Sequence, residues 1–151
     1  MAMALIASMR ATCVRRSVGC VLVDSKGFVL ATGYNGGPSG LPHCVDSTCS
    51  REHCSSGDGL DICEAIHAEQ NALLQCPDTQ KISTAYVTAS PCVHCMKLFM
   101  NTSCNRIIFG EIYPGYEMLK YRWENSSRDF ERSIEQIDNI QIKVDYEPTT
   151  F

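Results

Sequence analysis

A single Cys-x-x-Cys pair and one preceding histidine constrain most strongly how this chain can fold. Cys92 and Cys95 form the pair, His67 lies in an earlier segment, and the sequence contains no second Cys-x-x-Cys. Histidine nitrogen and cysteine sulfur are ligands that suit a tetrahedral Zn²⁺ ion, and a closed structural site needs four of them. Three ligands leave one position for water. The residues therefore predict an open, catalytic zinc site that the fold assembles from two separate segments.

The segment around His67 is predicted to begin a helix. Apolar residues recur at helical spacing over 65–75, which places His67 in the opening turn. Side chains two residues apart point in nearly opposite directions within a helix, so His67 and Glu69 can converge only at a helix end. The zinc ion is therefore expected over the N-terminus of this helix.

A second helix is predicted to begin at Pro91, with Ser90 as its N-cap. Cys92 and Cys95 then share one face of the first turn. The positive end of the helix dipole favours the thiolate forms that bind metal. Two helix starts are thus expected to meet at one ion.

Glu69 is predicted to supply the proton transfers of a catalyst. Zinc lowers the pKa of a bound water from 15.7 to about 7, and the proton that is released must be taken up and delivered elsewhere. A carboxylate beside the metal can do both. Acidic residues are also common in the first turn of a helix for electrostatic reasons alone. The catalytic interpretation of Glu69 therefore depends on the metal ligands predicted beside it.

The sequence His67-Ala68-Glu69, followed by Pro91-Cys92-Val93-His94-Cys95, resembles the signature of the zinc-dependent cytidine deaminase superfamily. The resemblance implies zinc held by His67, Cys92 and Cys95, with hydroxide attacking an amino-bearing ring carbon. It also implies that Glu69 protonates the adjacent ring nitrogen and then the departing ammonia.

Three further fragments resemble the deoxycytidylate (dCMP) deaminases within that superfamily. They are Thr12 to Gly19, Gly33-Tyr34-Asn35-Gly36 and Ile66 to Ala72, and the resemblance extends from about Met9 to Tyr113. It implies conversion of dCMP to dUMP and ammonia, feeding dTMP synthesis. Deaminases of free cytidine and of tRNA adenosine usually lack the second fragment and a cysteine-rich stretch before the catalytic histidine.

The same resemblance assigns substrate contacts. Asn35 would contact the sugar or phosphate, Arg16 would help to hold the phosphate, and Tyr113 would close over the sugar–phosphate end; Ala68 would also touch the substrate. From the residues alone, Asn35 followed by Gly36 also fits a plain turn after a strand.

Relatives of this kind are often activated by dCTP, inhibited by dTTP and assembled into hexamers. We therefore expect a homo-oligomer with an effector site near a subunit contact. The candidate effector-binding residues are Gly33, Tyr34, Gly36 and Gly40.

The stretch at about 36–63 is predicted to be a Cys/His-rich, zinc-binding insertion. Its hydrophobic periodicity is weak, and metal binding can supply folding free energy that such a segment cannot gain by burial. The resemblance implies that a second, structural zinc is held by Cys13, Cys44, Cys49 and Cys63. His53 and Cys54 compete as ligands, and incidental free thiols are the other reading.

Composition sets the cellular context. A chain of 151 residues fits one domain, 1–151, and has no apolar span approaching the ~20 residues of a membrane helix. Thiols committed to metal belong in a reducing compartment, so we expect the cytoplasm, or the host cytoplasm for a viral protein. The net charge is −4 and the only basic cluster is Arg15-Arg16, which argues against long nucleic acid as substrate.

The predicted fold is α/β, with three α/β/α layers around a mixed, roughly five-stranded sheet, as in the cytidine deaminases. The predicted strands cover 18–23, 29–34, 86–88, 107–109 and 140–146, and helices are predicted at 2–10 and 116–128. The third and fourth strands flank the second ligand segment, the pattern of a crossover between parallel strands. Phe130, Ile134 and Ile137 recur at helical spacing, which favours a further helix there. Cys20, Cys76 and Cys104 are expected to be small core residues.

Two other interpretations remain open at this level. One is a deaminase of the same fold that acts on another cytosine nucleotide, a nucleoside or a modified base. The other is a non-catalytic zinc-binding or redox Cys-x-x-Cys protein, in which Glu69 has no role.

Overall fold

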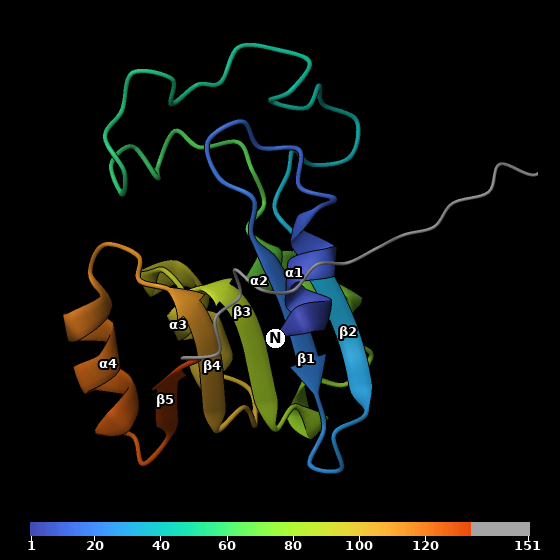
Figure 1. Cartoon of the computed structure of the whole chain (residues 1–151), viewed down its shortest axis with the longest axis vertical. Helices are drawn as coiled ribbons and strands as arrows, with labels where there is room; N and C mark the ends of the chain where they lie inside the picture. The colour runs from blue at the N-terminus through green and yellow to red at the C-terminus, as the bar shows by residue number, and fades with distance from the viewer. Residues whose placement is uncertain (134–151) are drawn as a thin grey trace, which may run out of the picture.

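The structure is a computed structural model and describes residues 1–133 (Figure 1). The predicted strand at 140–146, and Ile134 and Ile137 of the predicted helix, lie outside the described residues. The helices are α1 (Ala2–Ser8), α2 (Ala68–Gln75), α3 (Val93–Met100) and α4 (Tyr116–Glu124), with a short 3₁₀ turn at Thr79–Lys81. The strands are β1 (Gly19–Val23), β2 (Val29–Tyr34), β3 (Thr84–Ala89), β4 (Arg106–Glu111) and β5 (Asp129–Arg132).

The first two strands, both predicted from the sequence, pair as an antiparallel hairpin. Asp24 closes the turn, because its Oδ1 accepts hydrogen bonds from the backbone N–H groups of Lys26 and Phe28, both at 2.9 Å. Gly27 follows in the left-handed region at φ +85°, which only glycine adopts without strain. The turn thus fixes the register in which β1 pairs with β2.

The sheet is mixed, as predicted, with the order β2-β1-β3-β4-β5. β1 is antiparallel to both β2 and β3, whereas β3, β4 and β5 run parallel. α3 connects β3 to β4, so the predicted crossover is confirmed. The carboxyl ends of these two strands meet where Ser90 donates its N–H to the Glu111 carbonyl at 2.8 Å. Open parallel sheets bind ligands at such ends.

Helices cover both faces of the sheet, which gives the three predicted layers (Figure 1). α1 covers one face, where Ala4 packs on Val21 and Val23 of β1. The alternate residues of β1, Cys20 and Leu22, face the main core on the other side, to which α2, α3 and α4 contribute buried residues. Cys20 and Cys104 are fully buried and Cys76 is half-buried, in line with the predicted core role.

The described fifth strand is β5, which the sequence pattern did not identify. Phe130 was predicted to belong to a helix, and this is wrong, because it lies in β5 and pairs with Ile107 of β4. Phe130 is the one buried side chain of the four in the strand, and the centre of its ring lies 4.8 Å from the centre of the Phe109 ring. A strand with a single buried residue shows no alternation that a sequence pattern could reveal.

The insertion at about 36–63 contains neither helix nor strand between its isolated bridge at Gly36 and the start of α2. It forms a long loop that rises beyond the sheet (Figure 1). No helix in residues 1–133 combines the length and apolar character that crossing a membrane requires.

Candidate active site

The structure brings His67, Cys92 and Cys95 together. Both cysteine sulfurs lie 3.4 Å from His67 Nδ1, and the three ligand atoms all lie within 4.8 Å of one another. Bonds of 2.0–2.3 Å in a tetrahedral zinc site put nitrogen and sulfur about 3.6 Å apart. The donor set and its spacing therefore fit zinc, and in residues 1–133 no other group of three His, Cys, Asp or Glu side chains meets this spacing.

Two helix starts position the ligands, although both begin later than predicted. α2 begins at Ala68 with His67 as N-cap, and the His67 N–H donates to Gln70 Oε1 at 2.8 Å. That contact is the reciprocal half of a capping box, a signal that the spacing of His67 and Gln70 carries. The predicted start near residue 65 is therefore wrong by three residues.

α3 begins at Val93, and Cys92 is its N-cap. The predicted N-cap, Ser90, instead accepts a hydrogen bond from the Tyr113 N–H at 2.8 Å, which ties the end of β3 to the end of β4. Cys95 still lies in the first turn, so both sulfurs remain near the positive end of the helix.

The protonation states follow from burial and from mutual hydrogen bonds. A hydrogen bond with Cys95, supported by one with His67, lowers the pKa of Cys92 to about 4, despite the opposing effect of burial. The hydrogen bond with Cys92 raises the pKa of Cys95, and burial raises it further. The hydrogen bond to Cys92 raises the pKa of His67 above its ordinary value.

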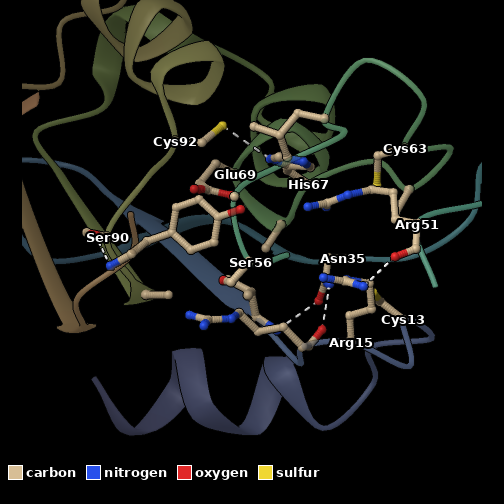
Figure 2. A pocket seen from close by; sticks show the side chains of 18 residues that line it. Cys13, Arg15, Asn35, Arg51, Ser56, Cys63, His67, Glu69, Ser90 and Cys92 are labelled. Atoms are coloured by element: carbon tan, nitrogen blue, oxygen red, sulfur yellow. Dashed lines mark hydrogen bonds between the residues drawn. The ribbon is translucent and has the colours of Figure 1, made fainter. Parts of the chain in front are cut away.

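Glu69 lies next to this cluster and is only 4% exposed. Figure 2 shows its carboxylate beside His67 and Cys92, facing the same space. Burial raises the pKa of Glu69 to about 7. A carboxyl group in such a position can both accept and donate a proton near neutral pH.

A pocket of about 280 Å³ opens over the cluster. Its walls include all four predicted substrate contacts, and Arg15 and Arg51 as well. The insertion supplies one wall, so it contributes to the pocket in addition to any metal that it holds. The pocket-lining residues of the insertion are Arg51, Ser56, Gly57, Leu60 and Cys63.

Asn35 lines the pocket, but its amide is occupied by the backbone. Its Oδ1 accepts from the Val18 N–H and its Nδ2 donates to the Arg16 carbonyl, both at 2.8 Å. Asn35 therefore fixes the chain at the pocket wall from a position that is 8% exposed.

Arg16 and Tyr113 lie against each other at the rim. The Arg16 guanidinium is 5.2 Å from the centre of the Tyr113 ring and pairs with Glu111 at 3.3 Å. The side chain of Arg16 is 34% exposed and that of Glu111 is 73% exposed, so solvent screens this ion pair.

Two arginines that line the pocket, Arg15 and Arg51, were not predicted from the sequence to contact the substrate. Arg51 is only 7% exposed, and its Nε donates to the Asp58 carbonyl at 2.8 Å. Arg15 donates to the carbonyls of Arg51 and Ser55, and to that of Cys54 at 2.7 Å. Arg15 was noted in the sequence only as part of a basic pair, and no sequence signal marks Arg51 as buried.

The predicted second metal site is only loosely gathered in the structure. Cys13, Cys44, Cys49 and Cys63 are all half-buried. Burial raises the pKa of Cys44, and Cys13, Cys49 and Cys63 raise it further, so each of these three lies within electrostatic range of Cys44. They do not form a ligand group with the close spacing of the first cluster. Of the competing ligands, His53 is exposed and Cys54 is half-buried.

Two of the four candidate effector residues, Gly33 and Gly36, are required by close packing. A Cβ on Gly33 would come within 2.2 Å of the Ala68 carbonyl oxygen, so glycine lets β2 approach α2 closely. A Cβ on Gly36 would come within 2.3 Å of Thr12 Oγ1. Tyr34 accepts from Asn71 Nδ2 at 2.6 Å through its carbonyl, and Gly40 takes a left-handed φ of +89°.

Comparisons with known proteins point to one family. Residues 1–111 match the family described as the cytidine and deoxycytidylate deaminase zinc-binding region. A deoxycytidylate deaminase of Saccharomyces cerevisiae is 36% identical over 117 residues, which cover 75% of this chain and 36% of that protein. A deoxycytidylate deaminase of Mycobacterium phage D29 is 38% identical over 111 residues, covering 68% of this chain and 84% of that one. The chain thus spans about a third of the yeast relative.

Among solved structures, the dCMP deaminase of cyanophage S-TIM5 in complex with dCMP and dUMP superposes with a TM-score of 0.68. It is 27% identical, and the match covers 87% of this chain and 92% of that one.

Proposed function

Because this chain belongs to the family of cytidine and deoxycytidylate deaminases, we propose that it hydrolyses dCMP to dUMP and ammonia. The observation that carries the proposal is Glu69, buried beside a three-ligand cluster at the floor of a pocket lined by three arginines. Relatives that carry the name deoxycytidylate deaminase support the choice of substrate.

His67, Cys92 and Cys95 would hold the catalytic zinc, and their separations support this assignment. When bound, zinc supplies Lewis acidity that makes water a nucleophile near neutral pH. We propose Cys13, Cys44, Cys49 and Cys63 as ligands of a second, structural zinc, with His53 and Cys54 as the competing ligands.

Glu69 would move the protons. Its carboxylate takes a proton from the attacking water and delivers one to the ring nitrogen beside the reacting carbon. Glu69 then takes the proton of the newly added hydroxyl group and delivers it to the amino group, so that the C–N bond breaks, the carbonyl forms and ammonia leaves. The buried position of Glu69 keeps bulk water away from these transfers.

The charge of the pocket supports a nucleotide substrate. The chain has a net charge of −4, yet Arg15, Arg16 and Arg51 all line the pocket. A 5′-phosphate matches this local excess of positive charge, whereas a free nucleoside does not. Asn35, Ala68 and Tyr113 line the same pocket. Asn35 is proposed to contact the sugar or phosphate, Tyr113 to close over the sugar–phosphate end, Arg16 to help to hold the phosphate and Ala68 to touch the substrate.

Side-by-side assays of dCMP, CMP, deoxycytidine and dCTP test the substrate. We expect fast ammonia release from dCMP, with kcat/KM at least tenfold above that of deoxycytidine. A single interaction with a charged partner contributes about 1.5–3 kcal/mol, or roughly 10- to 150-fold. Equal turnover of dCMP and deoxycytidine would refute the proposal for the nucleotide.

We further propose regulation by dCTP as activator and dTTP as inhibitor, with Gly33, Tyr34, Gly36 and Gly40 near the effector. The proposal follows the family and includes a homo-oligomer, of six chains by resemblance, that acts in the cytoplasm and feeds dTMP synthesis. We expect sigmoidal dependence of rate on dCMP that dCTP makes hyperbolic. A hyperbolic curve that neither triphosphate changes would exclude this regulation.

A further inference from the structure

Arg51 is the most deeply buried cation of the pocket. It is 7% exposed, lies in the insertion and lines the same pocket as His67 and Glu69. In Figure 2 its side chain reaches from the insertion toward His67. No ion pair joins Arg51 to a carboxylate anywhere in residues 1–133.

A buried guanidinium without a carboxylate is costly unless another group compensates its charge. The group has five N–H donors, and the Asp58 carbonyl takes the one on Nε. The neighbours of the remaining donors are the sulfur of Cys63, whose charge the proposed second zinc would compensate, and the phenol of Tyr113. Because no carboxylate of residues 1–133 pairs with Arg51, its pocket side is suited to an anion that a ligand provides.

The two adjacent arginines are already engaged. Arg16 is more exposed, at 34% for its side chain, and pairs with Glu111. The guanidinium of Arg15 donates hydrogen bonds to backbone carbonyls of the insertion, including that of Arg51 itself. Arg15 thus acts as a positioning residue that holds the segment carrying Arg51.

We propose that Arg51 is the principal contact for the 5′-phosphate of the nucleotide, a role that rests on the proposed function. The planar guanidinium matches two phosphate oxygens, and a charge-assisted pair gains strength where water is excluded. The insertion would therefore determine that the substrate must be a phosphate ester.

Arg51→Gln tests the proposal, with the exposed Arg122→Gln on α4 as matched control. We expect Arg51→Gln to lower kcat/KM for dCMP by about 10- to 100-fold, mostly through KM, and to change kcat/KM for deoxycytidine less than about threefold. The Arg122→Gln variant should match the wild type on both substrates. An equal loss on both substrates would indicate a merely structural role and overturn the proposal.

Binding measurements decide the matter independently of turnover. By titration calorimetry, Arg51→Gln should weaken dUMP binding but leave deoxyuridine binding unchanged, and inorganic phosphate should protect only the wild type against thermal unfolding. Equal phosphate protection of both proteins would contradict the proposal.

Should Arg51→Gln fail to fold, Arg51→Lys keeps the charge with fewer donors, and we expect a smaller loss of dUMP affinity. Unchanged dUMP affinity in Arg51→Lys would count against Arg51. A wild type that binds dUMP through Arg51 but deaminates no dCMP would refute the proposed function alone.

Discussion

Replacement of Glu69 by glutamine is expected to lower kcat for dCMP by about 10²- to 10⁴-fold, the range that positioned acid–base groups contribute. Glutamine keeps nearly the same shape in a site that is 4% exposed, but it cannot accept or deliver the protons of the reaction. Because Glu69 is not one of the three clustered ligands, the zinc content should stay at its wild-type value.

The measurement combines steady-state ammonia release with metal analysis of the same sample. Glu117→Gln, at an exposed position of α4, is the matched control and should keep full activity. A Glu69→Gln enzyme with wild-type kcat would show that another group carries the protons. Full zinc content and thermal stability would exclude misfolding as the cause of a loss.

Cys95→Ser should remove the catalytic metal and, with it, the activity. Only three side chains provide ligands in the cluster, and both sulfurs lie 3.4 Å from His67 Nδ1, so the loss of one sulfur leaves two protein ligands. We expect the zinc content to fall by about one equivalent per chain and deamination to fall to background. In the wild type, a chelator should have the same effect, and added zinc should reverse it.

Cys104→Ser is the control, because Cys104 is equally buried but lies in the core, with its thiol donating to the Arg106 carbonyl at 3.4 Å. This variant should lose stability and keep both zinc and turnover. Undiminished zinc and activity in Cys95→Ser would remove Cys95 from the site.

Much of the fold can be read from the sequence because its signals are local. The apolar run of β1 and the turn at Asp24 to Gly27 predict the hairpin, and the flanking strands predict the parallel pair around α3. β5 could not be found in this way, because Phe130 alone of its residues is buried and its contacts come from β4 and α4.

In the candidate site, too, features with local sequence signals could be predicted and features that depend on long-range contacts could not. The cluster of His67, Cys92 and Cys95 beside Glu69 follows from residue type and spacing. The helix starts were predicted too early because histidine and cysteine are unusual N-cap residues. Arg51 could not be identified, because its segment is held by hydrogen bonds from Arg15, which lies far away in the sequence. Long-range hydrogen bonds of this kind leave no pattern in the sequence.

The division of the pocket between two kinds of structure has an evolutionary consequence. The groups proposed to bind metal and move protons sit at the starts of α2 and α3, whereas one pocket wall comes from an insertion without helix or strand. Loops tolerate exchange far better than helices packed on a sheet. Descendants of such a chain could therefore acquire new substrates by remodelling this wall, while the reaction itself is inherited unchanged.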